Sequence, residues 1–364
     1  MGVKVQSVEP ILLSIPFEDG GSGTGGTPGR WHTLDTVLVK VTADNGLVGW
    51  GEAFGYFCHH AVGEHIRNLV AAQFIGRTLD DVEALNLEVQ RKLSLFGRCG
   101  LTIFALSGID IALWDLKAKA AGVDLATLIA GKRRRENVQA YASLVRYGDE
   151  ALVTRFCTQA VNEGFRSVKL HEVTLPEIRA ARSAIGPDVS LTVDVNCSWS
   201  ESQAMSLIPE LRALDVLWVE EPIFPPEDWD TLARLGQLGV DIAAGENACT
   251  AQEFGHLARA TRYLQPSITK VGGVSEFLRV ARLAAQTGRG LMPHSPYFGP
   301  GHYATQQMAA ALENFGLFEH LYVEPEAWFG GEPLTPHRGE VAIPRGPGIG
   351  FEPDPAVLER YAVC

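Results

Sequence analysis

The chain opens with segments in which apolar and polar residues alternate. Residues 3–15, 36–41 and 47–51 mix this alternation with apolar pairs, and the last two flank the turn Asp44-Asn45-Gly46. Alternation with a period of two is typical of strands that bury one face, and Asn-Gly marks a hairpin. The pattern predicts a small antiparallel sheet.

A glycine-rich stretch, residues 20–29, separates the first two of these strands. It contains no G-x-x-x-x-G-K-[ST] sequence and has no strand-to-helix context, which argues against a phosphate-binding loop. We expect a mobile loop that covers a site. Trp31 and His32, at its far end, are candidate substrate contacts.

Helical periodicity follows in residues 59–95 and 102–130. Helices packed on the small sheet would make an α+β domain over residues 1–130. From residue 137 the pattern changes to eight short apolar runs that alternate with helical stretches. The predicted strands are Val138–Ser143, Ser167–His171, Ser190–Asp194, Val216–Glu220, Asp241–Ala244, Tyr263–Ser267, Gly290–His294 and Leu317–Leu321.

Eight such units are the signature of a (β/α) barrel. An open, doubly wound sheet would also alternate, but even spacing over eight units favours closure. We therefore predict a barrel over residues 131–322. The segment 323–364, rich in glycine and proline, is expected to return to the first domain.

Composition narrows the class of protein without changing this fold. The 364 residues are 46% hydrophobic and 20% charged, as in a chain with a real core. A net charge of −12 without a long basic run argues against binding to nucleic acid or to an anionic membrane. No apolar run approaches the roughly 18 residues of a spanning helix. The six cysteines form no C-x-x-C pair, so a reducing cytoplasm is expected.

Polar residues stand where the predicted barrel strands end. Counted from Lys169 on the second strand, their successive spacings are 25, 26, 26, 21, 27 and 25 residues. A period of about 25 corresponds to one strand, one helix and two loops, which places every member on the C-terminal rim, where barrel enzymes carry out their chemistry. The residues are Lys169 with His171, then Asp194, Glu220, Glu246, Ser267, His294 and Glu319.

Asp194, Glu220 and Glu246 would lie on three adjacent strands. Three ionised carboxylates so close repel one another, and a captured proton or a bound cation resolves the repulsion. Ligation by oxygen alone selects a hard ion, Mg²⁺ first and Mn²⁺ second. Any one of these acids could instead cap a helix or form a salt bridge, but three at equal spacing favour a metal site. Asn196 and Glu221 closely follow two ligands and suit hydrogen bonds around the site, or helix caps.

Lys169 is the first candidate base. A divalent cation destabilises a nearby ammonium group, so we expect the pKa of Lys169 to fall toward that of a general base, with a salt bridge to the acids as the alternative. His171, two residues along the strand, could share the proton. His294 would face the substrate from the other side of the barrel mouth. Glu319 could bind a substrate carboxylate or pair with a base, and Tyr297 could wall the pocket.

A cation with bases on both sides is suited to one task. It removes the proton on the carbon α to a carboxylate and stabilises the resulting enediolate.

With these motifs the chain resembles the enolase superfamily, in its mandelate racemase/muconate lactonizing enzyme branch. The resemblance rests on Gly49-Trp-Gly-Glu52, Ala105 to Asp115, Val219-Glu-Glu-Pro222, Gly245-Glu-Asn247, Lys270-Val-Gly-Gly273 and Pro347-Gly-Ile-Gly350. It implies a (β/α)7β barrel with a capping domain, Mg²⁺ held by Asp194, Glu220 and Glu246, and a pocket roofed by residues 17–32. It also implies a homo-oligomer.

The chain departs from the family pattern at two positions. The second barrel strand carries Lys169-Leu-His171 where members usually have Lys-x-Lys, and Ser267 occupies the place of the aspartate that usually supports the histidine base. A hydroxyl cannot stabilise an imidazolium as a carboxylate does, so His294 should be a weaker base. Dehydration needs one base and one acid, whereas racemisation needs two bases.

The leading hypothesis is therefore dehydration of a sugar acid. The closest alternative is a racemase, epimerase or cycloisomerase of the same superfamily. A barrel metallohydrolase would generally bring histidine ligands on several strands, and here all three are carboxylates. A catalytically silent binding barrel is the remaining alternative. The expected ligand is a small carboxylate.

Overall fold

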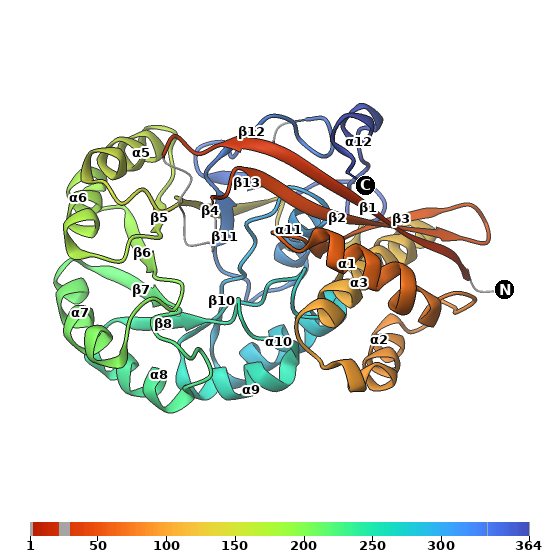
Figure 1. Cartoon of the computed structure of the whole chain (residues 1–364), viewed down its shortest axis with the longest axis horizontal. Coiled ribbons are helices and arrows are strands. Elements are labelled where there is room, and N and C mark those ends of the chain that lie inside the picture. Colours follow the sequence, from red (N-terminus) through yellow and green to blue (C-terminus); the bar gives the residue numbers. More distant parts are fainter. Residues whose placement is uncertain (1–2, 22–29, 333, 364) are drawn as a thin grey trace.

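The computed structural model describes residues 3–21, 30–332 and 334–363. The predicted glycine-rich loop therefore lies largely outside the described residues. Figure 1 shows a barrel flanked by a smaller domain, here called the cap, which contains the N-terminal sheet. Within the described residues, seven helices alternate with eight barrel strands, which confirms the predicted (β/α)7β fold.

The barrel strands follow the chain around the sheet in the order β10-β9-β8-β7-β6-β5-β4-β11. A bridge between Leu291 and Phe315 brings the two ends of this order together. The strands are β4 (Asn137–Ser143), β5 (Ser167–Leu170), β6 (Ser190–Asp194), β7 (Val216–Glu220), β8 (Asp241–Ala244), β9 (Tyr263–Leu264), β10 (Gly290–Leu291) and β11 (Phe318–Leu321).

Helices cover the outside of the barrel, and most of them bury one apolar face against it; α11 is the exception, because all of its residues are buried. They are α5 (Glu150–Asn162), α6 (Leu175–Ile185), α7 (Glu201–Ala213), α8 (Trp229–Leu235) with the short 3-10 helix Gly236–Leu238, α9 (Thr250–Ala260), α10 (Gly273–Thr287) and α11 (Pro300–Ala311). Inside the barrel, Tyr141, Trp218 and Ala243 are fully buried and pack together. They fill the interior below the C-terminal rim.

The cap is built on the antiparallel strands β1 (Val5–Glu18), β2 (Thr33–Ala43) and β3 (Val48–Phe54). Its helices are α1 (His59–His65), a π-helix (Ile66–Val70), the 3-10 helices Ala71–Gln73 and Ser94–Phe96, α2 (Val82–Lys92), α3 (Leu101–Ala121) and α4 (Leu125–Ala130). Helix α3 approaches the sheet closely because Gly51 and Gly108 face each other without side chains. A Cβ atom on Gly51 would lie 1.9 Å from the Gly108 carbonyl oxygen.

The predicted helical stretch 59–95 is wrong as a continuous element. The helix stops after Gln73, and Gly76 adopts a φ of 77°. The chain then runs beside β1, where the N–H of Val5 donates to the Arg77 carbonyl at 2.9 Å. Asp81 starts α2 afresh because its side chain accepts from the Ala84 N–H at 2.9 Å.

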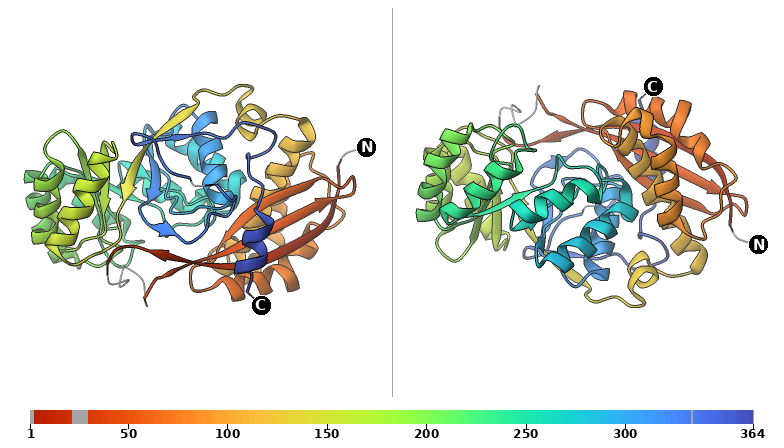
Figure 2. Two further views of the ribbon diagram at one scale, coloured as in Figure 1. Left: turned by 90° about the horizontal axis from the view of Figure 1, so that it is seen from above. Right: turned by 90° about the horizontal axis from the view of Figure 1, so that it is seen from below.

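The C-terminal segment contacts both the cap and the barrel. Strand β12 (Glu324–Pro325) pairs with β1, while β13 (Glu340–Ala342) pairs with β4. Asp115 in α3 accepts from the Ile349 N–H at 2.7 Å, and the Val363 N–H donates to the Leu12 carbonyl at 3.0 Å. Figure 2 shows α12 (Pro355–Tyr361), in dark blue, lying against the cap sheet.

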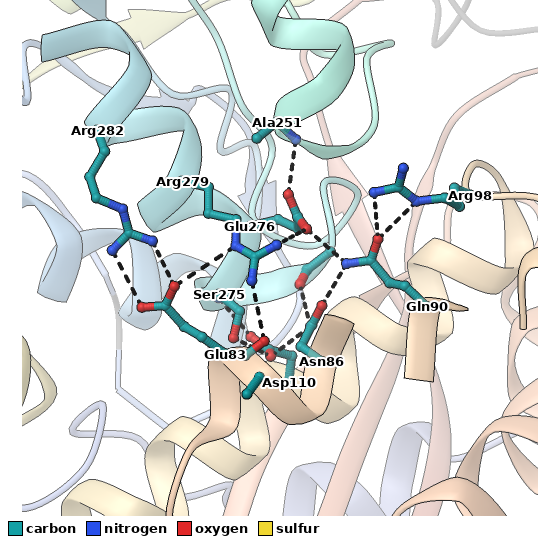
Figure 3. A network of polar contacts seen from close by, with 12 residues as sticks. Glu83, Asn86, Gln90, Arg98, Asp110, Ala251, Ser275, Glu276, Arg279 and Arg282 are labelled. Carbon is teal, nitrogen blue, oxygen red and sulfur yellow. Dashed lines mark hydrogen bonds and ion pairs between the residues drawn. The ribbon is translucent and has the colours of Figure 1, made fainter. Parts of the chain in front are cut away.

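A buried polar network fixes the cap to the barrel (Figure 3). Asp110 of α3 accepts from the Asn86 amide at 2.7 Å and from the Ser275 hydroxyl at 2.6 Å. Glu276 of α10 accepts from Gln90 at 2.8 Å. Because the cap and the barrel are joined through fully buried groups, cap residues hold defined positions over the barrel mouth. In the part of the chain that the structure describes, no helix is long and apolar enough to cross a membrane.

Candidate active site at the C-terminal rim of the barrel

A cavity of about 580 Å³ lies at the C-terminal ends of the barrel strands. Both domains line it, since its wall combines residues that follow the barrel strands with aromatic residues of the cap. The lining residues are Trp31, Phe54, Tyr56, Phe57, Ser143, Val145, Arg146, His171, Asn196, Cys197, Phe224, Pro226, Glu246, Asn247, Lys270, His294, Pro296, Glu319 and Leu321.

The three predicted metal ligands lie close together beside this cavity: Glu246 lines it, whereas Asp194 and Glu220 are fully buried behind its wall. Each of Asp194, Glu220 and Glu246 offers one carboxylate oxygen within 4.8 Å of the others. Asp194 and Glu220 pair in register at the ends of β6 and β7, and Glu246 follows β8 by two residues. The donor set consists of three oxygens from three adjacent strands, which is suited to a hard divalent cation.

Burial and mutual repulsion set the protonation of this group. Burial, together with the charge of Asp194, raises the pKa of Glu220 well above its ordinary value. Burial would also raise the pKa values of Asp194 and Glu246. At Asp194, however, the charges of Lys169 and His171 outweigh the effect of burial and lower the pKa. His294 likewise holds the pKa of Glu246 at about 2. The predicted repulsion is thus present, and in the chain alone one acid favours its protonated form.

Lys169 lies at the centre of the acids and is fully buried. Its Nζ is 2.8 Å from Glu319, 3.0 Å from Glu220 and 3.2 Å from Asp194. Burial opposes the ammonium charge, but the surrounding carboxylates prevail and the pKa of Lys169 lies well above its ordinary value. The expected fall in this pKa refers to a site that holds a divalent cation, so it stays a prediction. In the chain alone, Lys169 forms the alternative arrangement, a salt bridge to the acids.

Two imidazoles stand at opposite ends of the acidic group. His171 Nε2 lies 3.4 Å from Asp194 Oδ2, and His294 Nε2 lies 2.8 Å from Glu246 Oε2. His171 Nδ1 is held at 2.5 Å from the Leu144 carbonyl oxygen. Both rings line the cavity, whereas the side chain of Lys169 is 0% exposed and does not.

Ser267 and Tyr297 form a pair behind the cavity. Their hydroxyl groups hydrogen-bond to each other, and Tyr297 is buried and absent from the cavity wall. The prediction that Tyr297 walls the pocket is therefore wrong, because its side chain does not line the cavity. Its ring lies edge-on to His294, with centroids 6.1 Å apart. Within the described residues, His294 Nδ1 is buried without a hydrogen-bond partner, so Ser267 does not serve this ring.

Glu319 takes the second of its two predicted roles and pairs with a base. Besides Lys169, its carboxylate accepts from the Ser143 hydroxyl at 2.8 Å and from the Ser295 N–H at 2.8 Å. Burial would raise the pKa of Glu319, but Lys169 and His294 lower it. Glu319 also lines the cavity, so it lies within reach of a ligand while ionised.

Asn196 and Glu221 orient the acids through the backbone. Both have positive φ, 44° and 42°, which is unusual for residues with side chains and clusters at functional sites. The Asn196 N–H donates to Asp194 Oδ1 at 2.9 Å. Glu221 Oε1 accepts from the Gly245 N–H at 2.9 Å, beside Glu246. Burial, then the charge of Glu246, raises the pKa of Glu221 to about 8.

The two residues beyond the glycine-rich stretch differ in position. Trp31 lines the cavity, with its ring 4.9 Å from that of Tyr56. His32 is exposed and absent from the wall, and its carbonyl accepts from the Phe17 N–H at 2.9 Å. The side chain of His32 therefore does not belong to the cavity, because the start of β2 turns it outward.

Sequence reasoning missed two cations of the wall, Arg146 and Lys270. Arg146 lies three residues after Ser143, the last residue of β4. Lys270 lies three residues after Ser267, which itself follows the end of β9. The search for polar residues stopped at the strand ends themselves. Extending it by three residues would have found both, although the same step from His294 leads to the buried Tyr297.

Both domains of this chain match known protein families. Residues 27–130 match the family Mandelate racemase / muconate lactonizing enzyme, N-terminal domain, and residues 152–357 match Enolase C-terminal domain-like. The chain is 33% identical to D-galactarolactone cycloisomerase of Agrobacterium fabrum, with 99% of each chain covered. It is 28% identical to arabinonate dehydratase of Saccharolobus solfataricus, with 91% of each covered.

A solved structure of an enolase has the same overall fold as this chain. The enolase of Bradyrhizobium complexed with magnesium and mandelic acid superimposes with a TM-score of 0.87 at 25% identity, covering 100% of this chain and 99% of that one. The matched family domains together span both the cap and the barrel. The chain belongs to the mandelate racemase/muconate lactonizing enzyme branch of the enolase superfamily.

Proposed function

We propose that the protein removes the proton on the carbon α to a carboxylate and that it dehydrates a sugar acid. The observation that carries the proposal is the pair of imidazoles at opposite ends of three clustered carboxylates, on the wall of one cavity. Relatives named as sugar-acid dehydratases and cycloisomerases support the same chemistry.

The ion that fits the three carboxylates is Mg²⁺, with Mn²⁺ as the alternative, because all three donors are oxygen. When bound, it would supply positive charge to the carboxylate of the substrate as negative charge develops there. Asp194, Glu220 and Glu246 would hold it. Asn196 and Glu221 would keep two of these ligands in place through the bonds described above.

Different side chains of the cavity act as the base and as the acid in the proposed reaction. His171 lines the cavity, so it is the proposed base that takes the α-proton, with Lys169 behind it. The bond from the β-carbon to its hydroxyl then breaks, and His294 gives that hydroxyl a proton so that it leaves as water. The remaining enol takes up a proton and becomes a 2-keto acid. Among the residues that the structure describes, no carboxylate accepts from His294 Nδ1, which suits an acid better than a second base.

Cycloisomerisation is the second candidate, favoured by the relative at 33% identity. It shares the removal of the α-proton but conserves the atoms of the substrate, so the product has an unchanged mass. A small carboxylate ligand and a homo-oligomeric assembly remain proposals drawn from the site and the family.

The test is a screen of diastereomeric sugar acids with Mg²⁺ in D₂O, followed by NMR and mass spectrometry. We expect loss of water from at least one acid. His171→Asn should abolish both deuterium exchange and elimination, whereas His294→Asn should keep exchange and lose elimination. His256→Asn, an exposed residue of α9, is the matched control and should change neither. Exchange without loss of water from any acid would refute dehydration.

A further inference from the structure

Arg146 is one of the cations that line the cavity. It follows β4 by three residues. Its Nε donates to the His171 carbonyl at 2.6 Å, which fixes the side chain beside the proposed base. The guanidinium group is therefore anchored at one edge, and its two terminal nitrogens remain for other contacts.

No acid of the described residues pairs with this guanidinium. Across residues 3–21, 30–332 and 334–363, no carboxylate lies within 4.0 Å of it, and Nη2 is buried without a hydrogen-bond partner. Glu172 belongs to the next barrel loop, but its carboxylate accepts from the Tyr147 and Gly148 N–H groups. A buried charged donor without an acceptor is costly, so its presence calls for a partner.

The other cations of the site have different surroundings. Lys169 has three carboxylates within 3.2 Å. Lys270, like Arg146, forms no salt bridge within the described residues, but it lies over the Phe54 ring at 5.0 Å and leaves no buried donor without an acceptor. Arg146 is therefore the cation of the wall whose buried donor a ligand could satisfy. A guanidinium group matches a carboxylate in shape, through two parallel hydrogen bonds.

The cavity is large enough for such a ligand. Its volume of about 580 Å³ lies within the range of sites that hold a whole small molecule. Trp31, Phe54, Tyr56 and Phe224 contribute aromatic side chains to its wall. A substrate held by its reacting carboxylate at the acidic group could therefore extend along this wall to a second polar contact.

We infer that the substrate is a polyhydroxy dicarboxylate, whose second carboxylate, remote from the reacting carbon, binds Arg146. This inference rests on the proposed function, because that function places the first carboxylate at the acidic group. A phosphate at the far end of a sugar acid shares the same anionic chemistry. We favour the carboxylate because a single guanidinium group matches its single charge.

The test compares matched substrates in wild type and Arg146→Gln. Each aldarate is paired with the aldonate of the same configuration and with its terminal phosphate ester, all with Mg²⁺. We expect wild type to prefer the aldarate in kcat/KM. Arg146→Gln should lower kcat/KM for the aldarate by about 10- to 100-fold, the value of a charge-assisted hydrogen bond. The same substitution should change kcat/KM for the aldonate by less than about 3-fold. For the aldarate, kcat/KM of Arg146→Lys should lie between those of wild type and Arg146→Gln.

Controls separate this inference from the proposed function and from misfolding. Arg179→Gln removes an exposed arginine that pairs with Glu210, and it should leave the aldarate preference unchanged. If loss of the bond to His171 impairs turnover of every substrate, the ratio of dissociation constants for aldarate and aldonate, measured by calorimetry, replaces the ratio of kcat/KM.

Equal preference for aldonate and aldarate in wild type, or an equal loss of affinity for both in Arg146→Gln measured by calorimetry, would overturn the inference and leave the proposed function standing. A higher kcat/KM for the phosphate ester would overturn the choice of carboxylate. If no acid of any class exchanges its α-proton, the proposed function itself fails.

Discussion

Replacement of Lys169 by Met tests whether a cation binds the acidic group, because the ammonium of Lys169 neutralises that group in the chain alone. Met has a similar length and no charge. The substitution leaves three buried carboxylates without their cation, each of which lies 2.8–3.2 Å from Nζ. Breaking a buried ion pair by removing one partner costs about 3–5 kcal/mol.

The size of this loss sets a measurable shift in unfolding temperature. For 364 residues, an unfolding entropy of about 2.1 cal/mol/K per residue gives roughly 0.8 kcal/mol/K. A loss of about 3–5 kcal/mol therefore lowers Tm by about 4–7 °C in EDTA. In excess Mg²⁺, the ion supplies the missing charge and stabilises the folded chain by mass action, so the deficit should shrink by about half or more.

Scanning calorimetry of both proteins, in EDTA and in Mg²⁺, measures the two deficits. The control is Lys119→Met, since Lys119 pairs with the buried Asp115 at 2.9 Å in the cap, away from the acidic group. Its deficit should be the same in both buffers. A deficit for Lys169→Met that does not change with Mg²⁺ would refute the assignment of the acidic group as a cation site.

Two further changes test the core of the cap. Burial raises the pKa of Glu52 from 4.5 to about 7, so its contribution to stability is present below pH 4.5 and is lost as pH rises toward 7. Glu52→Gln should therefore reduce the dependence of the free energy of unfolding on pH between pH 5 and 8, and it should raise that free energy by about 3 kcal/mol at pH 8. Urea unfolding at several pH values measures this, and parallel curves of free energy against pH for wild type and variant would contradict it. Gly51→Ala should cost about 3 kcal/mol because its Cβ would meet the Gly108 carbonyl, while Gly255→Ala, in open space on α9, should gain about 0.5–1 kcal/mol. Equal effects in thermal unfolding would contradict that contrast.

The barrel and its acidic group were predictable because they repeat. Strand, loop and helix lengths fix a period of about 25 residues, so Asp194, Glu220 and Glu246 could be placed on one rim without coordinates. The family motifs then implied a capping domain over this rim. Periodicity fixes where a side chain starts, and for these short acids that position nearly determines where the carboxylate lies.

The remaining parts of the site depend on contacts that no local pattern carries. Tyr297 was expected in the pocket, yet its hydroxyl turns toward Ser267, a residue thirty positions earlier. Arg146 and Lys270 lie in loops, whose paths follow from tertiary contacts. The pKa of Lys169 depends on Glu319, which is distant in sequence and adjacent only once the barrel closes.

The return of the C-terminal segment to the cap has a consequence for how the protein is made. The sheet that begins with β1 receives its fourth strand, β12, about three hundred residues later, and the Val363 N–H reaches the Leu12 carbonyl only after the whole barrel has been synthesised. Domains that emerge first from the ribosome usually fold first. Here the cap strands must wait for residues that follow the barrel in the chain, so the nascent cap exposes an unpaired strand edge throughout translation of the barrel. Grafting a cap from a relative would likewise require both ends of the donor chain.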